Sequence, residues 1–114
     1  MLLRSGWSRI RDGDTYCLSG PGIAPEVART LREKLLNLRA IGMDWISVSS
    51  YADRESGRKT HRVFLDPDGP NNPVLIIEDM DIPLELDRLK SVIVRPLRVE
   101  GIDSAPCTII GIIE

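Results

Sequence analysis

Apolar residues recur at every third or fourth position between residues 24 and 41, and this spacing is typical of an amphipathic helix. The stripe consists of Ala24, Val27, Ala28, Leu31, Leu35, Leu38 and Ile41. Pro25 suits the first helical turn, where a missing N–H costs nothing, and Gly42 suits the end of a helix. The pattern therefore predicts one main helix over residues 25–41, with its stripe facing the core.

Alternating or short apolar runs elsewhere in the chain predict β-strands. A first hairpin is expected over residues 7–18, with its turn at Asp12-Gly13. A second hairpin is expected from residues 45–51 and 60–65, with a polar tip at 52–59. The remaining predicted elements are strands at 74–77, 92–99 and 107–113 and one or two helical turns within 81–89.

These elements predict an α+β fold in which a mostly antiparallel β-sheet packs against the main helix at about residues 25–41. The chain of 114 residues has the size of one domain, so we expect a single domain over residues 1–114. Residues 107–113 are apolar on both faces of the predicted strand. We expect them to be buried, either in the sheet or at a subunit interface.

The composition is that of an ordinary globular protein, with 42% apolar and 28% charged residues. Neither a membrane-spanning run nor a signal peptide is recognisable, so we expect a soluble, cytoplasmic protein without a membrane partner. Cys17 and Cys107 match no metal-binding spacing. They are expected to be buried, reduced thiols, and a single disulfide is the alternative for an exported chain.

The charges are distributed unevenly along the chain. Residues 1–42 carry seven basic and four acidic groups, whereas residues 67–114 carry four basic and nine acidic groups. Such a split favours head-to-tail self-association or binding to a charged partner. It does not match the strong basic excess of a dedicated nucleic-acid binder.

A second face of the predicted helix carries basic residues around one leucine. Arg29, Arg32, Leu36 and Arg39 follow one another at spacings of three, four and three, on a flank away from the apolar stripe. Arginine is enriched at protein interfaces, so this flank is the predicted partner-binding surface. The partner is expected to be a second copy or another protein. The alternative is a solvated helix face with one exposed leucine.

Basic side chains also gather at and beside the tip of the second predicted hairpin, namely Arg54, Arg58, Lys59, His61 and Arg62. Arginine binds phosphate, and Tyr51 or Trp45 offers a stacking surface for a base. Asp53 and Glu55 lie within the same tip and oppose this interpretation. The pattern indicates nucleic-acid binding as the alternative function.

Little in the sequence indicates catalysis or metal binding. His61 is the only histidine, and no Ser-, Cys- or carboxylate-based motif surrounds it, so no catalytic residue is predicted. The acidic residues Glu78, Asp79 and Asp81 have the oxygen ligands of a cation site. A solvated strand end with Asp81 as a helix N-cap is the favoured interpretation. No cofactor and no metal are predicted.

Residues 74–79 resemble the ribose-binding strand end of type I phosphoribosyltransferases. In that family a Thr- and Gly-rich phosphate loop follows directly, whereas Met80, Asp81, Ile82, Pro83 and Leu84 follow here. We therefore interpret the resemblance as chance. The sequence favours a small non-enzymatic interaction or assembly domain that acts through self-association or a protein partner. A nucleic-acid-binding module that uses a basic β-hairpin tip is the alternative.

Overall fold

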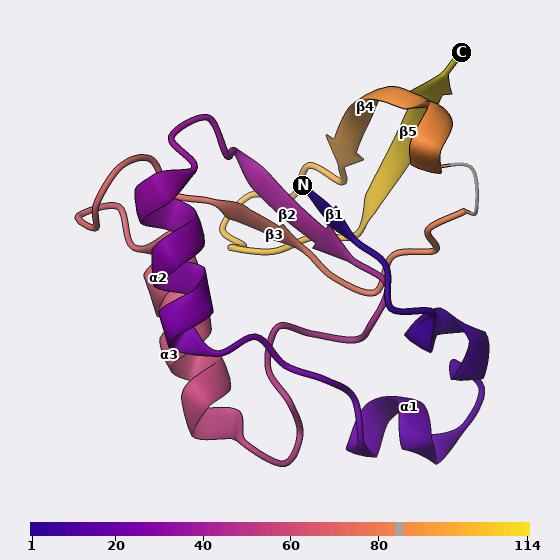
Figure 1. The fold of residues 1–114 in the computed structure, drawn as a ribbon, viewed down its shortest axis with the longest axis horizontal. Helices are drawn as coiled ribbons and strands as arrows, with labels where there is room; N and C mark the ends of the chain where they lie inside the picture. The colour runs from indigo at the N-terminus through magenta and orange to yellow at the C-terminus, as the bar shows by residue number, and fades with distance from the viewer. Residues whose placement is uncertain (84–85) are drawn as a thin grey trace. The chain divides into compact units, whose positions relative to one another are not determined.

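The computed structural model describes residues 1–83 and 86–114 (Figure 1). The chain forms two compact units, Met1–Ile82 and Pro83–Glu114, and each is described by itself. The prediction of a single domain stays a prediction, because compactness does not show whether either unit folds alone.

A three-stranded parallel sheet lies at the centre of the first unit. Its strands are β1 (Leu2–Leu3), β2 (Ala40–Met43) and β3 (Leu75–Ile77), in the order β1-β2-β3. The prediction of a mostly antiparallel sheet is therefore wrong. Parallel neighbours need a long crossover between them, and helices supply it here. The crossover from β1 to β2 contains η1 (Trp7–Ile10), α1 (Asp14–Leu18) and α2 (Pro25–Lys34), and the crossover from β2 to β3 contains α3 (Arg54–Leu65).

The main predicted helix is confirmed over Pro25–Lys34, as α2, but its predicted continuation over residues 35–41 is wrong. The predicted stripe extends to Ile41 because this apolar residue of strand β2 fits the helical spacing by chance. Ile41 instead lies fully buried in β2. Gly42, predicted to stop the helix, lies in the same strand, where a Cβ would come within 2.5 Å of Met80 Sδ and 2.7 Å of Leu2 Cδ2. A larger residue at this position would therefore displace the ends of these two side chains.

Both predicted hairpins of the first unit are wrong. Residues 7–18 form η1 and α1, and Gly13 is the N-cap of α1 instead of a turn residue. Residues 45–51 form a loop, and residues 54–65 form α3. The predicted polar tip begins this helix, since the Asp53 carboxylate accepts a hydrogen bond of 3.0 Å from the Ser56 N–H. Gly57, Thr60 and Phe64 are its buried face at helical spacing.

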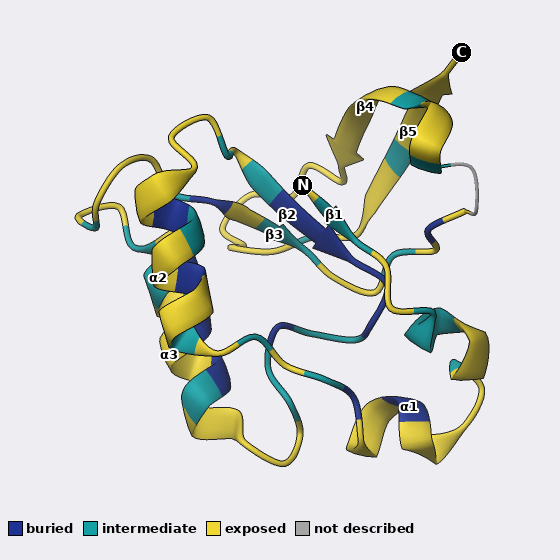
Figure 2. Ribbon diagram, viewed as in Figure 1, coloured by how far each residue is buried: buried dark blue, intermediate teal, exposed yellow. Residues whose placement is uncertain are grey.

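The core of the first unit lies between the sheet and the side-by-side helices α2 and α3 (Figure 2). Its buried residues are Ala28, Ile41, Met43, Trp45, Val48, Phe64 and Val74. The predicted apolar stripe contributes Ala28 and Ile41, with Leu31 and Leu38 packed against the cluster, but Val27 and Leu35 are exposed.

The second unit is an antiparallel two-stranded ribbon. It contains η2 (Leu86–Arg88), β4 (Leu89–Pro96) and β5 (Cys107–Ile113). The strand predicted at 107–113 is confirmed, and the strand predicted at 92–99 begins three residues earlier and ends at Pro96. The predicted helical turn survives as η2, while residues 84–85 of that segment lie outside the described residues. All of β5 except Ile109 is exposed, which leaves the subunit-interface alternative open.

No helix within the described ranges is long and apolar enough to cross a membrane.

Candidate functional site

Polar side chains follow all three strands of the parallel sheet, at the edge where their carboxyl ends meet. The buried Asp44, just after β2, accepts hydrogen bonds of 2.7 Å from the Ser5 N–H, 2.8 Å from Ser5 Oγ and 2.7 Å from the Gly6 N–H. Burial by itself raises the pKa of Asp44, but these donors outweigh it and leave the pKa below its ordinary value. Asp44 thus ties the chain after β1 to the end of β2.

Glu78, directly after β3, anchors the loop that follows β2. One carboxylate oxygen, Oε1, accepts 2.8 Å hydrogen bonds from Ser47 Oγ and from the Val48 N–H, and it lies 3.4 Å from His61 Nε2. Gly57 of α3 packs against the same loop, where a Cβ would overlap the Ser49 side chain. Strand β3, helix α3 and the loop therefore hold one another in place.

His61 is fixed by backbone and lies beside Glu78. Its Nδ1 lies 2.9 Å from the Gly57 carbonyl oxygen and 3.3 Å from Ser49 Oγ. A ring nitrogen that faces a carbonyl oxygen must carry the proton, so Nδ1 is a donor and cannot take a proton from Ser49. The Ser49–His61 contact is therefore not a nucleophile–base pair.

Asp79 makes a separate network on the other side of the strand end. Its carboxylate accepts hydrogen bonds from Tyr16 Oη and from Arg11 Nε, the latter over 3.1 Å. Burial and the hydrogen bond to Asp79 raise the pKa of Tyr16 to about 12. The backbone of Asp79, just after β3, has a positive φ of 54°, which lies in the left-handed region. Glu78 and Asp79 thus belong to two separate hydrogen-bond networks. Residues 1–83 and 86–114 hold no group of three or more side chains that could bind one metal ion.

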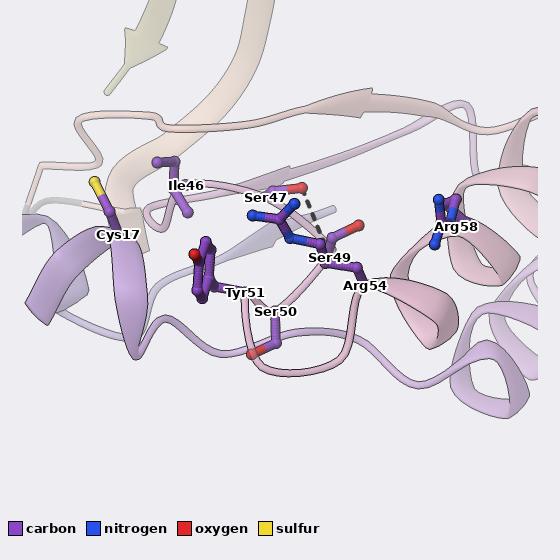
Figure 3. A pocket seen from close by; sticks show the side chains of 8 residues that line it. All are labelled: Cys17, Ile46, Ser47, Ser49, Ser50, Tyr51, Arg54 and Arg58. Atoms are coloured by element: carbon purple, nitrogen blue, oxygen red, sulfur yellow. Dashed lines mark hydrogen bonds between the residues drawn. The ribbon is translucent and has the colours of Figure 1, made fainter.

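A pocket of about 410 Å³ opens beside the loop after β2 (Figure 3). Its walls are Cys17, Ile46, Ser47, Ser49, Ser50, Tyr51, Arg54 and Arg58. The Arg54 guanidinium lies 4.5 Å from the centroid of the Tyr51 ring. Ser47, Ser49 and Ser50 lie in the segment predicted as a strand at residues 45–51, and three hydroxyls within four residues suit a binding loop.

The residues predicted for nucleic-acid binding lie on α3 and not on a hairpin tip. Arg54 and Arg58 line the pocket, whereas Arg62 lines a groove between α2 and α3. Lys59 pairs with Glu55 at 2.8 Å. His61 contacts the Gly57 carbonyl oxygen and lies beside Glu78.

The residues predicted for partner binding do not form one helical flank. Arg32 is only 1% exposed, and its guanidinium donates hydrogen bonds to three backbone carbonyls. Leu36, 64% exposed, and the exposed Arg39 lie beyond the end of α2. Of the four predicted residues, only Arg29 is both exposed and part of α2. The predicted flank is wrong because α2 ends at Lys34 and because the long side chain of Arg32 reaches inward.

Cys17 and Cys107 are both free thiols. The prediction that they are buried is wrong, because both are exposed.

Comparison of the chain with protein-family models, with curated proteins and with solved structures found no match.

Proposed function

We propose that this protein is a small interaction or assembly domain that acts through self-association. The observation that carries the proposal is one face of the β4–β5 ribbon that contains no polar side chain. In an antiparallel pair, directly opposite residues share a face, and neighbours along a strand alternate between faces. The register of the pair therefore assigns to this apolar face Val92, Val94, Pro96, Cys107, Ile109 and Ile113, with Gly111 among them, and the pairing of Leu89 with Ile113 places Leu89 there despite a register shift between Leu89 and Ser91.

The opposite face of the ribbon is mixed. It carries Ser91, Arg95 and Thr108 beside Ile93, Ile110 and Ile112. A sheet with one apolar and one partly polar face is typical of a sheet that buries one side and exposes the other. Val92, Val94 and Ile113 on the apolar face are nonetheless exposed. A two-stranded ribbon is also marginally stable by itself, so covering this face would stabilise it.

A second copy of the chain is the occupant that we favour. The apolar face has no charge, so two identical faces related by a two-fold axis meet without like-charge repulsion. β5 also lacks any charged residue or proline, the usual devices by which edge strands avoid other strands, whereas β4 contains Lys90, Arg95 and Pro96. The oligomeric mass by light scattering tests the proposal, with Val94→Glu as the disrupting variant and Ile93→Glu as its control.

Nucleic-acid binding through α3 stays a second proposal. Arg54, Arg58 and Arg62 are exposed at four-residue spacing, and none has an ion-pair partner in the part of the chain that the structure describes. Phosphate contacts of this kind weaken as salt rises. Retention on heparin that is lost between low and high salt supports this proposal, and a lack of retention at low salt contradicts it.

A further inference from the structure

Within the described residues, a pocket beside the loop after β2 and a groove between α2 and α3 both contain arginine, and they differ in whether carboxylates accompany it. The groove between α2 and α3 is lined by the acidic residues Glu26, Glu33 and Asp66 and by the basic residues Arg29, Arg32, Lys59 and Arg62, so most of its charges offset one another. The pocket beside the loop after β2 contains Arg54 and Arg58 and no carboxylate. Of these two pockets, this one has arginines and no carboxylate among its walls.

The two arginines of this pocket have their N–H groups available. Within residues 1–83 and 86–114, neither Arg54 nor Arg58 makes a hydrogen bond or an ion pair. They lie one turn apart on α3, so both side chains project from the same side of the helix. Guanidinium groups in this state bind a phosphate through paired hydrogen bonds.

The Tyr51 ring fixes the orientation of one of these groups. The Arg54 Cζ atom lies over the ring, 4.5 Å from its centroid, and this cation–π contact holds the group without using an N–H hydrogen bond. Figure 3 shows Tyr51, Arg54 and the serines of the loop grouped together, with Arg58 further along α3. A guanidinium held in this way loses less conformational entropy when it binds an anion.

The rest of the pocket is suited to the organic part of a ligand. Ile46, Cys17 and the Tyr51 ring supply apolar surface, and the volume of about 410 Å³ lies within the range of small-molecule sites. Glu78 holds the loop to the carboxyl end of the sheet. This end of the sheet is the edge where α/β folds bind ligands. We propose that this pocket binds a small phosphorylated organic molecule, with Arg54 and Arg58 on its phosphate group.

Calorimetric titration of the full chain with adenosine monophosphate, ribose 5-phosphate and phenyl phosphate tests this proposal. At least one of the three is expected to bind, and Arg54→Gln or Arg58→Gln is expected to weaken that binding about tenfold or more. Arg62→Gln removes a charge from the same helix but outside the pocket and is the matched control. It is expected to leave the affinity unchanged, and thermal melting confirms that the variants fold.

Three further ligands distinguish the sources of the phosphate. Adenosine, which lacks the phosphate, is expected not to bind. Inorganic phosphate that binds as tightly as the best ester overturns the proposal in favour of a plain anion site, and binding of a single-stranded oligonucleotide alone overturns it in favour of nucleic acid. The proposal is also overturned if no phosphate ester binds, or if Arg62→Gln weakens binding as much as Arg54→Gln does.

Discussion

The Arg32 guanidinium of α2 donates a 2.6 Å hydrogen bond to the Val63 carbonyl oxygen in the last turn of α3. The same group donates to the carbonyl oxygens of Asp66 and Asn71, over 2.6 and 3.1 Å. Carbonyls at a helix C-terminus lack intrahelical partners, and a cation there is favourable. Arg32 therefore joins the two helices and the turn that leads to β3, and it is a structural residue.

Replacing this arginine tests that role. Arg32→Lys is expected to lower the free energy of unfolding by about 2 kcal/mol, because one ammonium group cannot span three carbonyls and because leaving buried acceptors unpaired is costly. Arg29→Lys, on the exposed side of the same helix, is expected to change it by less than about 0.5 kcal/mol. Urea unfolding of the two variants measures the difference. Equal effects would contradict the structural role that the three carbonyl contacts assign to Arg32.

Glu78 is expected to matter for stability, while its acidic neighbour Asp81 is not. Glu78→Gln weakens the acceptor that holds Ser47 Oγ and the Val48 N–H, and a cost of about 1 kcal/mol is expected. Asp81 is exposed and makes no hydrogen bond or ion pair within the described part of the chain, so Asp81→Asn is expected to be neutral. Chemical denaturation of both variants provides the comparison. A neutral Glu78→Gln would mean that the loop is held without this carboxylate.

The stability of the first unit is expected to fall in acid because of Asp44. Its pKa lies below the ordinary value in the folded state, so this contribution is present above about pH 4 and is lost as the pH falls through the folded pKa. Ser5→Ala removes one of its donors and is expected to reduce the pH dependence of the unfolding free energy between pH 6 and pH 2.5. The account of Asp44 is wrong if that dependence stays the same in Ser5→Ala.

The hydroxyl group of Tyr16 is expected to stay protonated up to an unusually high pH. Its pKa of about 12 exceeds the ordinary value near 10, so its contribution to stability is present below about pH 10 and is lost as the pH rises through 12. The absorbance of tyrosinate in the native protein should show a phase with a midpoint near pH 12. That phase should vanish in Tyr16→Phe; its persistence would assign it to another group.

The sequence predicts local features well where a single residue has a strong local preference. Pro25 at the start of α2 and the apolar run of β5 are examples, since both follow from local geometry. The parallel sheet was missed because β1 and β3 are only two and three residues long, too short to show a period. The four residues of β2 were concealed by Ile41, whose position continues the helical spacing.

The candidate pocket was predictable only in part. Arg54, Arg58 and Tyr51 were recognised as groups that contact phosphates and bases, but they were assigned to a hairpin tip. The capping of α3 by Asp53 through the Ser56 N–H is the local signal for a helix start that was overlooked. The role of Arg32 had no signal in the sequence, because its partners are backbone carbonyls more than thirty residues away along the chain.

The central claim, self-association through the apolar face of the β4–β5 ribbon, is tested most directly by light scattering on two neighbouring variants. Val94 and Ile93 are 38% and 46% exposed but lie on opposite faces of β4, so a glutamate at each position has a similar effect on the single chain. The wild type and Ile93→Glu are expected to be dimers, and Val94→Glu a monomer. A monomeric wild type, or a Val94→Glu variant that remains a dimer, would contradict the account, and a monomeric Leu36→Glu would move the interface to the chain beyond α2.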